Sequence, residues 1–349
     1  MSGTAIPLRV EPASPPRDRL GRPLRDLRIS VVDRCNFRCP YCMPEDLYPR
    51  DHEFLAKHER LRFEEIERLV RVFAALGVRK LRLTGGEPLL RRDLPTLVRA
   101  LAAVPGIEDV ALTTNGSLLA AQAAALREAG LHRITLSLDT LDPATFRTLS
   151  GGRGEVADVL AAIAAAEQAG FARLKINCVV VRGVNDGQVP ALIEHFRGSG
   201  HVVRFIEYMD VGTCNEWRRD RVVPSAELRE RIAARWPLRA LGANYGGEVA
   251  RRWAFADGGG EIGFISSVTE PFCGGCTRAR LSADGKLYTC LFAASGHDLR
   301  GALRAGADEG ELARLVAAVW NARDDRYSEL RASLPPSPRE HVEMYSIGG

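Results

Sequence analysis

Apolar residues alternate between two patterns over most of the first two thirds of the chain. Short, mainly apolar runs predict strands over residues 28–32, 80–84, 109–113, 133–138, 174–181 and 202–208. Between them, apolar residues recur at helical spacing, as at Ile66, Leu69, Val70 and Phe73, and predict helices over about 66–77, 94–101, 118–128, 156–169 and 189–196. Strands that alternate with amphipathic helices indicate a parallel sheet covered by helices.

Six such units are too few for a closed eight-stranded barrel. The pattern therefore predicts an α/β fold that is either an open doubly wound sheet or an incomplete, crescent-shaped barrel. In both folds the ligands lie at the carboxyl ends of the strands. This rule marks four segments as candidate site residues: 85–87, 113–115, 137–139 and 208–210.

The pattern changes after about residue 225. A helix over about 225–234, hairpin-like segments at 248–255 and 261–265, a further short hairpin and a helix over about 309–321 predict a smaller α+β portion packed on the open side of the sheet. We expect three parts: a flexible, Pro-rich arm (1–20) without a catalytic role, a partial barrel (21–225) and a C-terminal domain (226–349).

Composition narrows the class of protein. The 349 residues are 46% hydrophobic, and 48 Lys and Arg against 44 Asp and Glu leave a net charge of +4. That balance disfavours a general nucleic-acid or membrane-surface binder. No stretch approaches the roughly 18 apolar residues of a membrane span, and the first residues lack an export signal. We expect a soluble, cytoplasmic protein with neither nucleic-acid nor membrane partners.

Six of the eight cysteines form two triplets, which in a cytoplasmic chain indicate metal or redox chemistry. Cys35, Cys39 and Cys42 follow the first predicted strand. Three thiolates on one loop can hold three irons of a [4Fe–4S] cube and leave the fourth iron open to a ligand. The alternative is zinc completed by a distant residue such as His52 or His58, although zinc usually takes its ligands in two close pairs.

The second triplet, Cys273-x2-Cys276-x13-Cys290, lies on a predicted hairpin. Its spacing alone fits either a structural zinc site or a second three-cysteine cluster. Cys178 and Cys214 belong to no motif, and we interpret Cys178 as a packed core thiol.

Two motifs resemble the radical S-adenosylmethionine (SAM) superfamily: CNFRCPYCMP after the first strand and TGGEP after the second. The resemblance extends to the GTP 3',8-cyclase family of molybdenum cofactor biosynthesis. It is carried by LRDLRISVVDRCNFRCPYCMP, KLRLTGGEPLLRRDL, LTTNG, ITLSLD, RFIEYMDVG, FCGGCTRARLSADGKLYTCLF and the terminal Gly-Gly, and spans about residues 22–349.

The resemblance implies an incomplete (β/α)6 TIM-like barrel whose open side is closed by the C-terminal α+β portion. It implies two [4Fe–4S] clusters: one on Cys35, Cys39 and Cys42 whose open iron binds SAM, and one on Cys273, Cys276 and Cys290 whose open iron meets the purine of GTP. SAM would contact Tyr41, Gly86, Ser137 and Met209. GTP would contact Arg28, Lys80, Arg82, Thr113, Lys175, Arg204, Arg278 and Arg280. The Gly348-Gly349 tail would enter the pocket in a supporting role.

The same resemblance implies the chemistry. A 5'-deoxyadenosyl radical takes H3' from the ribose of GTP, and the C3' radical attacks C8 of guanine. The product is (8S)-3',8-cyclo-7,8-dihydroguanosine 5'-triphosphate, in the first step of molybdopterin biosynthesis. The implied partners are an external electron donor, a separate cyclic pyranopterin monophosphate synthase and a second copy of the chain.

Two alternatives from other classes make different predictions. A radical SAM enzyme that acts on a peptide would have an acidic or apolar interior instead of basic residues within its strands. A zinc-dependent nucleic-acid binder would carry surface basic patches, interleaved aromatic residues and a higher net charge.

Overall fold

The computed structural model describes residues 15–333 and 341–349. Six parallel strands are hydrogen-bonded in chain order and form a curved sheet that does not close, which confirms the predicted open α/β architecture. These strands are β1 (Asp26–Ser30), β2 (Lys80–Thr84), β3 (Asp109–Thr114), β4 (Arg133–Ser137), β5 (Lys175–Val180) and β6 (Val202–Glu207).

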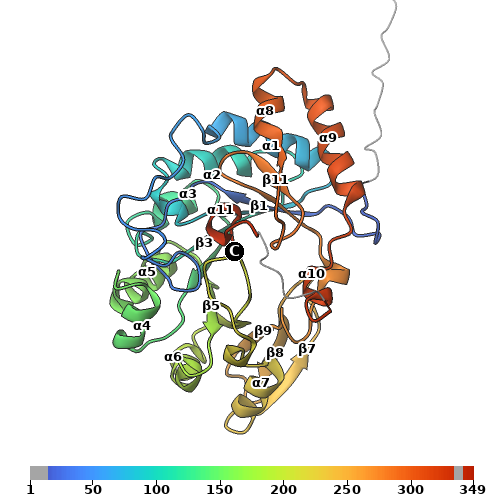
Figure 1. Cartoon of the computed structure of the whole chain (residues 1–349). Helices are drawn as coiled ribbons and strands as arrows, with labels where there is room; N and C mark the ends of the chain where they lie inside the picture. The colour runs from blue at the N-terminus through green and yellow to red at the C-terminus, as the bar shows by residue number, and fades with distance from the viewer. Residues whose placement is uncertain (1–14, 334–340) are drawn as a thin grey trace, which may run out of the picture.

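Helices cover the outer face of the sheet (Figure 1). They are α1 (Phe63–Ala75), α2 (Leu94–Ala102), α3 (Ala123–Glu128), α4 (Pro143–Leu149), α5 (Val156–Gln168) and α6 (Val189–Phe196). The sequence pattern did not predict α4, a short helix that begins where Asp142 accepts a hydrogen bond from the Thr145 amide at 2.8 Å. The predicted helix at 118–128 is shorter than expected, because residues 118–122 form turns.

Alternation along each strand separates the core from the inner face. Leu27, Leu81 and Ile176 are fully buried in the single large hydrophobic core that the strands share with the helices. The residues next to them in sequence, Arg28 and Arg82 among them, point the other way because successive side chains of a strand lie on opposite faces. A basic residue in these strands is therefore directed to the concave inner face.

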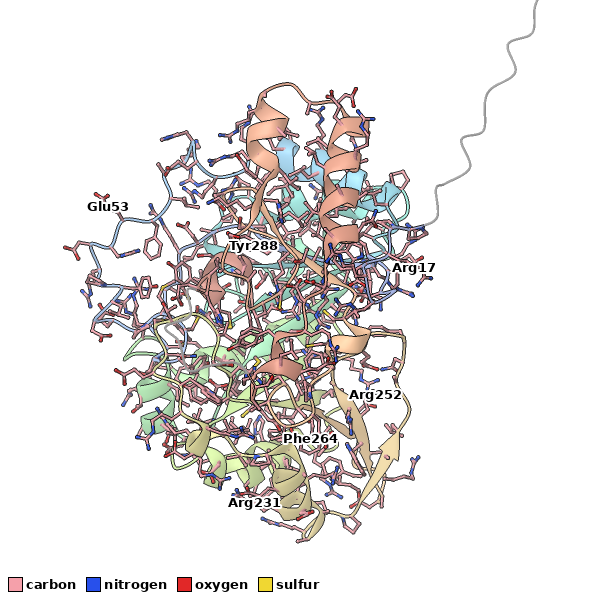
Figure 2. The ribbon with its side chains drawn as sticks, turned by 45° about the vertical axis from the view of Figure 1, so that its right-hand side comes forward. Arg17, Glu53, Arg231, Arg252, Phe264 and Tyr288 are labelled. Atoms are coloured by element: carbon pink, nitrogen blue, oxygen red, sulfur yellow. The ribbon has the colours of Figure 1, made fainter. Side chains whose placement is uncertain are left out.

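The C-terminal part extends both edges of this sheet. After α7 (Ser225–Ala233), the strands β7 (Leu238–Leu241), β8 (Arg251–Phe255) and β9 (Glu261–Ile265) add to the β6 edge, with β9 parallel to β6. The strands β10 (Arg278–Leu281), β11 (Lys286–Tyr288) and β12 (His297–Asp298) add to the β1 edge, with β10 parallel to β1. In Figure 2, Tyr288 of β11 lies in the upper part of the molecule, and Arg252 of β8 and Phe264 of β9 lie in the lower part.

The remaining helices are α8 (Leu299–Arg304), α9 (Glu309–Ala322), α10 (Tyr327–Leu330) and α11 (Met344–Ile347). Short 3-10 turns occupy Pro88–Leu90, Asp186–Gln188, Arg219–Arg221 and Cys273–Gly275. The last helix, α11, packs on β1, and the chain ends near the centre of the molecule (Figure 1). In the part of the chain that the structure describes, no helix combines the length and apolar character that a membrane crossing requires.

Residues 15–20 belong to the arm in the sequence-based division, and the structure packs them against the C-terminal part. Asp18 is 5% exposed, and the Arg19 amide donates a hydrogen bond to the Arg323 carbonyl at 3.1 Å. Residues 1–14 lie outside the described residues.

Candidate active site

Two rows of polar side chains run across β10, β1 and β2 on the inner face. One row consists of residues that pair in register across the three strands: Arg280, Arg28 and Arg82. The second row lies two residues earlier in each strand and consists of Arg278, Asp26 and Lys80. Because every second side chain of a strand lies on the same face, five cations and a single carboxylate share one surface. Arg278 and Arg280 face the same side, as their spacing of two predicts.

These cations lower one another's basicity. Burial and then the neighbouring Arg280, Arg278 and Arg82 hold the pKa of Arg28 well below its usual value. Burial is also the main cause of the lowered pKa values of Arg82 and Arg280, both about 10. Within the described residues none of these three arginines makes an ion pair with a carboxylate. Like charges that outnumber the single carboxylate beside them favour the binding of an anion.

Two further cations extend the surface along β5 and β6. Arg204 donates through Nε to Asn177 Oδ1 at 2.9 Å, and burial lowers its pKa to about 9. Lys175 is the second: burial and then Arg204 lower its pKa to about 7. Arg82 Nη1 donates to Thr113 Oγ1 at 2.9 Å, which fixes the direction of that guanidinium.

One cavity of about 190 Å³ joins this basic surface to the second cysteine triplet. Its lining includes all of the residues that the resemblance assigns to GTP except Lys175, which interacts with Arg204 and Arg82 without lining the cavity. Three cysteines, Cys273, Cys276 and Cys290, also line it. The structure therefore brings together residues as far apart in the sequence as Arg28 and Cys290.

The thiols of the two triplets differ in their surroundings. Burial opposes ionisation of Cys276, yet Arg278 and Arg323 outweigh it and lower the pKa of that thiol to about 7. Burial raises the pKa of Cys290 to about 11. In the first triplet, burial raises the pKa of all three thiols, to about 12 for Cys35. Burial thus opposes the thiolate form of these five thiols, and of the five only Cys276 has enough adjacent positive charge to reverse the effect.

All eight cysteines are free thiols. Among the described residues, no three His, Cys, Asp or Glu side chains are close enough together to bind a single metal ion. In a [4Fe–4S] cube each cysteine binds a different iron, so three thiols suit that group without converging on one ion.

The first triplet lies on the loop after β1 and is held by the loop after β2. The Glu87 amide donates to the Arg34 carbonyl at 2.8 Å, and a Cβ at Gly86 would overlap that carbonyl and lie 2.9 Å from the Cys35 amide nitrogen. Glycine is thus required at residue 86 by contact between the two backbones, besides any contact with a ligand. Asn115, at the end of β3, directs its amide to Cys35 Sγ at 3.9 Å.

Of the residues expected to bind SAM, Gly86 contacts this loop and Tyr41 belongs to it. The Tyr41 hydroxyl donates to Asp139 Oδ2 at 2.6 Å, and the Val179 amide donates to the other carboxylate oxygen at 2.8 Å. Ser137 is the last residue of β4. Met209 follows β6 and lines the cavity.

The C-terminal tail reaches the same cavity. Gly349 lines it, and Arg280 Nη1 donates a hydrogen bond to the Gly348 carbonyl. Gly348 has a φ of +75°, and a Cβ there would overlap Thr84 Cγ2. A side chain at residue 348 would therefore conflict both with the backbone conformation and with β2.

Comparison with known proteins assigns the chain to a family. Residues 29–196 match the Radical SAM superfamily and residues 201–329 match Molybdenum Cofactor Synthesis C. The chain is 65% identical over 336 residues to a GTP 3',8-cyclase of Xanthomonas axonopodis pv. citri, covering 96% of this chain and 99% of that protein. The chain belongs to the GTP 3',8-cyclase family. Members from Acidothermus cellulolyticus and Staphylococcus carnosus are 54% and 45% identical, covering 94% and 95% of this chain and 92% and 98% of theirs.

Solved structures support the fold of this cyclase family member. Streptococcus suis SuiB bound to S-adenosylmethionine aligns with a TM-score of 0.60 at 17% identity, covering 93% of this chain and 77% of that one. At this identity the likeness establishes the fold alone. With the Radical SAM match, it supports the incomplete barrel that the sequence predicted.

Sequence reasoning missed several residues of the site in this family member. Tyr245 lines the cavity with its ring centroid 3.2 Å from Lys80 Nζ. Arg323 donates to Cys276 Sγ at 3.1 Å. Neither lies in a motif or in a strand with a recognisable alternation, so only the folded chain reveals them.

Proposed function

We propose that this chain catalyses the cyclisation of GTP to (8S)-3',8-cyclo-7,8-dihydroguanosine 5'-triphosphate, the first step of molybdopterin biosynthesis. The relatives from Xanthomonas axonopodis pv. citri and Acidothermus cellulolyticus are GTP 3',8-cyclases, which supports this activity. The observation that carries the proposal is the cavity itself, in which Arg28, Arg82 and Arg280, none of them ion-paired to a carboxylate of the described residues, adjoin three cysteines. A nucleoside triphosphate has the matching chemistry, an anionic chain at one end and a purine at the other.

The basic rows bind the triphosphate in this proposal. Arg28, Arg82 and Arg280 present guanidinium groups that suit phosphate oxygens, and Lys80, Lys175, Arg204, Arg278 and Thr113 complete the site. Phosphate charge would relieve the mutual repulsion that lowers the pKa values of these groups. The same basic surface disfavours the alternative of a peptide substrate.

The first loop holds a [4Fe–4S] cluster through Cys35, Cys39 and Cys42, and SAM lies against Tyr41, Gly86, Ser137 and Met209. When bound, this pair of cofactors supplies the 5'-deoxyadenosyl radical that removes H3' from the ribose. The protein's part is positional. Asp139 fixes Tyr41 through its hydroxyl, and Met209 lies in the cavity wall, so that SAM and the nucleotide meet at one place.

The second triplet, Cys273, Cys276 and Cys290, holds a second [4Fe–4S] cluster that faces the guanine. Free, partly buried thiols in a cationic wall fit a cluster of negative overall charge. The Gly348-Gly349 tail fills the space above β2, where it orients reacting groups and excludes water. The chain acts as a homodimer, draws electrons from an external donor and passes its product to a cyclic pyranopterin monophosphate synthase.

An anaerobic assay of the reconstituted protein with dithionite, SAM and GTP tests the proposal. We expect 5'-deoxyadenosine and the cyclised nucleotide to appear together and only when GTP is present. Arg28→Met should abolish the nucleotide product, whereas Arg235→Met, which removes an exposed arginine paired with Glu194, should not. Formation of 5'-deoxyadenosine with GTP left unmodified would exclude GTP as the substrate.

A further inference from the structure

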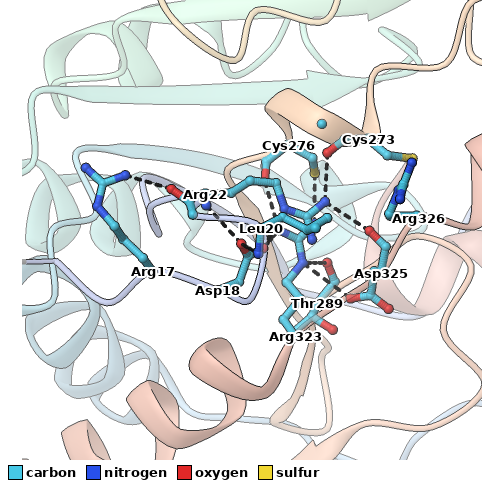
Figure 3. A network of polar contacts seen from close by, with 12 residues as sticks. Arg17, Asp18, Leu20, Arg22, Cys273, Cys276, Thr289, Arg323, Asp325 and Arg326 are labelled. Carbon is cyan, nitrogen blue, oxygen red and sulfur yellow. Dashed lines mark hydrogen bonds and ion pairs between the residues drawn. The ribbon is translucent and has the colours of Figure 1, made fainter.

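A buried ionic network adjoins the second cysteine triplet and includes the N-terminal segment (Figure 3). The Asp18 carboxylate accepts from Arg22 Nε at 2.5 Å and from Arg323 Nη1 at 3.0 Å. The three side chains are at most 3% exposed. Burying three charged groups costs free energy unless their hydrogen-bonding capacity is used, so their partners indicate what the network holds in place.

Those partners are backbone carbonyl groups at, or next to, each of the three cysteines. Arg22 Nη1 donates to the Cys273 carbonyl at 2.7 Å, and Arg323 Nη1 donates to the Cys276 carbonyl at 2.8 Å. Arg323 Nε donates to the carbonyl of Thr289, the residue before Cys290, at 3.1 Å. Two guanidinium groups thus fix two segments that are separated in sequence, the turn at 273–276 and the chain just before Cys290, as Figure 3 shows.

Arg323 also contacts sulfur directly. Its Nη2 donates to Cys276 Sγ at 3.1 Å, while its remaining nitrogens are occupied by Asp18 and the two carbonyls. The face of the guanidinium lies 4.6 Å from the ring centroid of Trp320, which is buried. The half-exposed Asp325 accepts from Nε at 3.3 Å, through a different nitrogen from the one that meets sulfur. The guanidinium therefore has one orientation, with a charged N–H directed at the thiol.

We propose that Arg323 is a positioning residue for the second cluster: held by Asp18, it fixes Cys276 and makes the cluster easier to reduce through its hydrogen bond to Sγ. The inference rests on the second cluster of the proposed function. Reduction adds negative charge that spreads onto the ligand sulfurs, so a buried cationic donor at a ligand sulfur stabilises the reduced form more than the oxidised form. The end of the N-terminal arm thereby becomes part of the site.

A purely structural role for Arg323 predicts a different result. If the side chain only tied the loops together, its loss would lower the iron content without moving the reduction potential of the clusters that still assemble. The test therefore needs the potential of the second cluster alone. We would measure it by EPR-monitored redox titration of the full chain in which Cys35, Cys39 and Cys42 are all replaced by Ala.

In that background, we expect Arg323→Gln to shift the second cluster to a more negative potential. At the potential where the parent is half reduced, its reduced-to-oxidised ratio should fall about tenfold, as expected for the loss of a charge-assisted hydrogen bond. Arg323→Lys keeps the charge but lacks the planar guanidinium. Its second cluster should have a reduction potential between those of the parent and Arg323→Gln. The matched control is Arg235→Gln, which removes an exposed arginine paired with Glu194 and should keep the parent potential.

Asp18→Asn provides a test of opposite sign. It leaves Arg323 in place and removes the carboxylate that neutralises it, so the potential should become more positive. This variant decides the matter if neither substitution at Arg323 retains iron. An unchanged potential in every variant that binds iron would overturn the role of Arg323. A parent that binds no iron at the second triplet would instead overturn the second cluster itself, before any substitution is compared.

Discussion

The C-terminal tail offers a prediction that the geometry makes quantitative. Replacing Gly348 with Ala forces an L residue to a φ of +75° and places its Cβ onto Thr84 Cγ2. The other near atoms of Thr84, Oγ1 and Cβ, would lie at 3.0 and 3.1 Å. Only the γ-methyl is therefore in severe conflict, and Thr84→Ser removes that methyl while it keeps the hydroxyl.

The two penalties can be separated. A non-glycine residue in such a backbone conformation costs about 1–3 kcal/mol, which lowers the equilibrium constant for tail docking about 5- to 150-fold. The overlap with Thr84 adds to this in Gly348→Ala and is absent from the double variant with Thr84→Ser. We expect Gly348→Ala to lose nearly all cyclisation, and the double variant to recover to the loss set by the backbone alone.

The measurement is the anaerobic yield of cyclised nucleotide for the parent, both single variants and the double variant, together with thermal unfolding. Gly348 is the penultimate residue and follows a helix of four residues, so its substitution should shift the melting temperature by less than about 2 °C. Thr84→Ser alone deletes one buried methyl and should stay close to the parent in activity, at a cost of about 0.8 kcal/mol in stability.

Two results would refute the reasoning. A double variant no more active than Gly348→Ala would show that contact with Thr84 is not what excludes a side chain. Full activity in Gly348→Ala would show that the tail need not occupy the cavity during the reaction.

Three further predictions concern the cavity and the first loop. Arg82→Met should weaken GTP binding about tenfold, measured by equilibrium dialysis, and the loss should be larger at low salt. The binding of guanosine, which has no phosphates, should change little. An equal loss of guanosine binding would place Arg82 away from the phosphates. Burial and then Arg204 lower the pKa of Lys175 to about 7, so at pH 8 the free protein holds this amine neutral. Phosphate favours the ammonium form, so at pH 8 GTP binding to the parent should take up about one proton more than GTP binding to Lys175→Met, whereas at pH 5.5 the two proteins should exchange equal numbers of protons; calorimetry in buffers of different ionisation enthalpy measures this exchange. Gly86→Ala would overlap the Arg34 carbonyl, so iron content should fall by about half, and iron equal to the parent's would contradict that contact.

Local patterns explain how much of the fold and site could be predicted. Each cysteine triplet is close in sequence. The face of the sheet on which Arg28 and Arg82 lie can be predicted, because apolar and polar residues alternate along these strands. The order β1 to β6 follows from repeated strand–helix units, because consecutive units of this kind pack side by side. The start of α4 could also have been predicted, since Asp142 before Pro143 is typical of a helix N-terminus.

The rest depends on contacts between distant segments. Asp18 and Arg323 are paired across 305 residues, and Asp18 lies in a stretch without hydrophobic periodicity. The pairing of β10 with β1 and of β9 with β6 depends on how the C-terminal strands return to the sheet, which no local spacing encodes. Tyr245 reaches the cavity from a loop whose path is set by the same return.

The twelve-strand order also constrains how the chain is synthesised and folded. When residues up to about 225 have left the ribosome, β1 and β6 are both complete and both lack their outer neighbours, which arrive only with β9 and β10. Unpaired strand edges readily recruit other chains. The nascent protein therefore has two unpaired strand edges while roughly the last third of the sequence is translated. The segments that later pair with these edges are the ones that carry the second cysteine triplet and flank its cavity. Completion of the sheet and completion of the cavity are, in this chain, the same folding event.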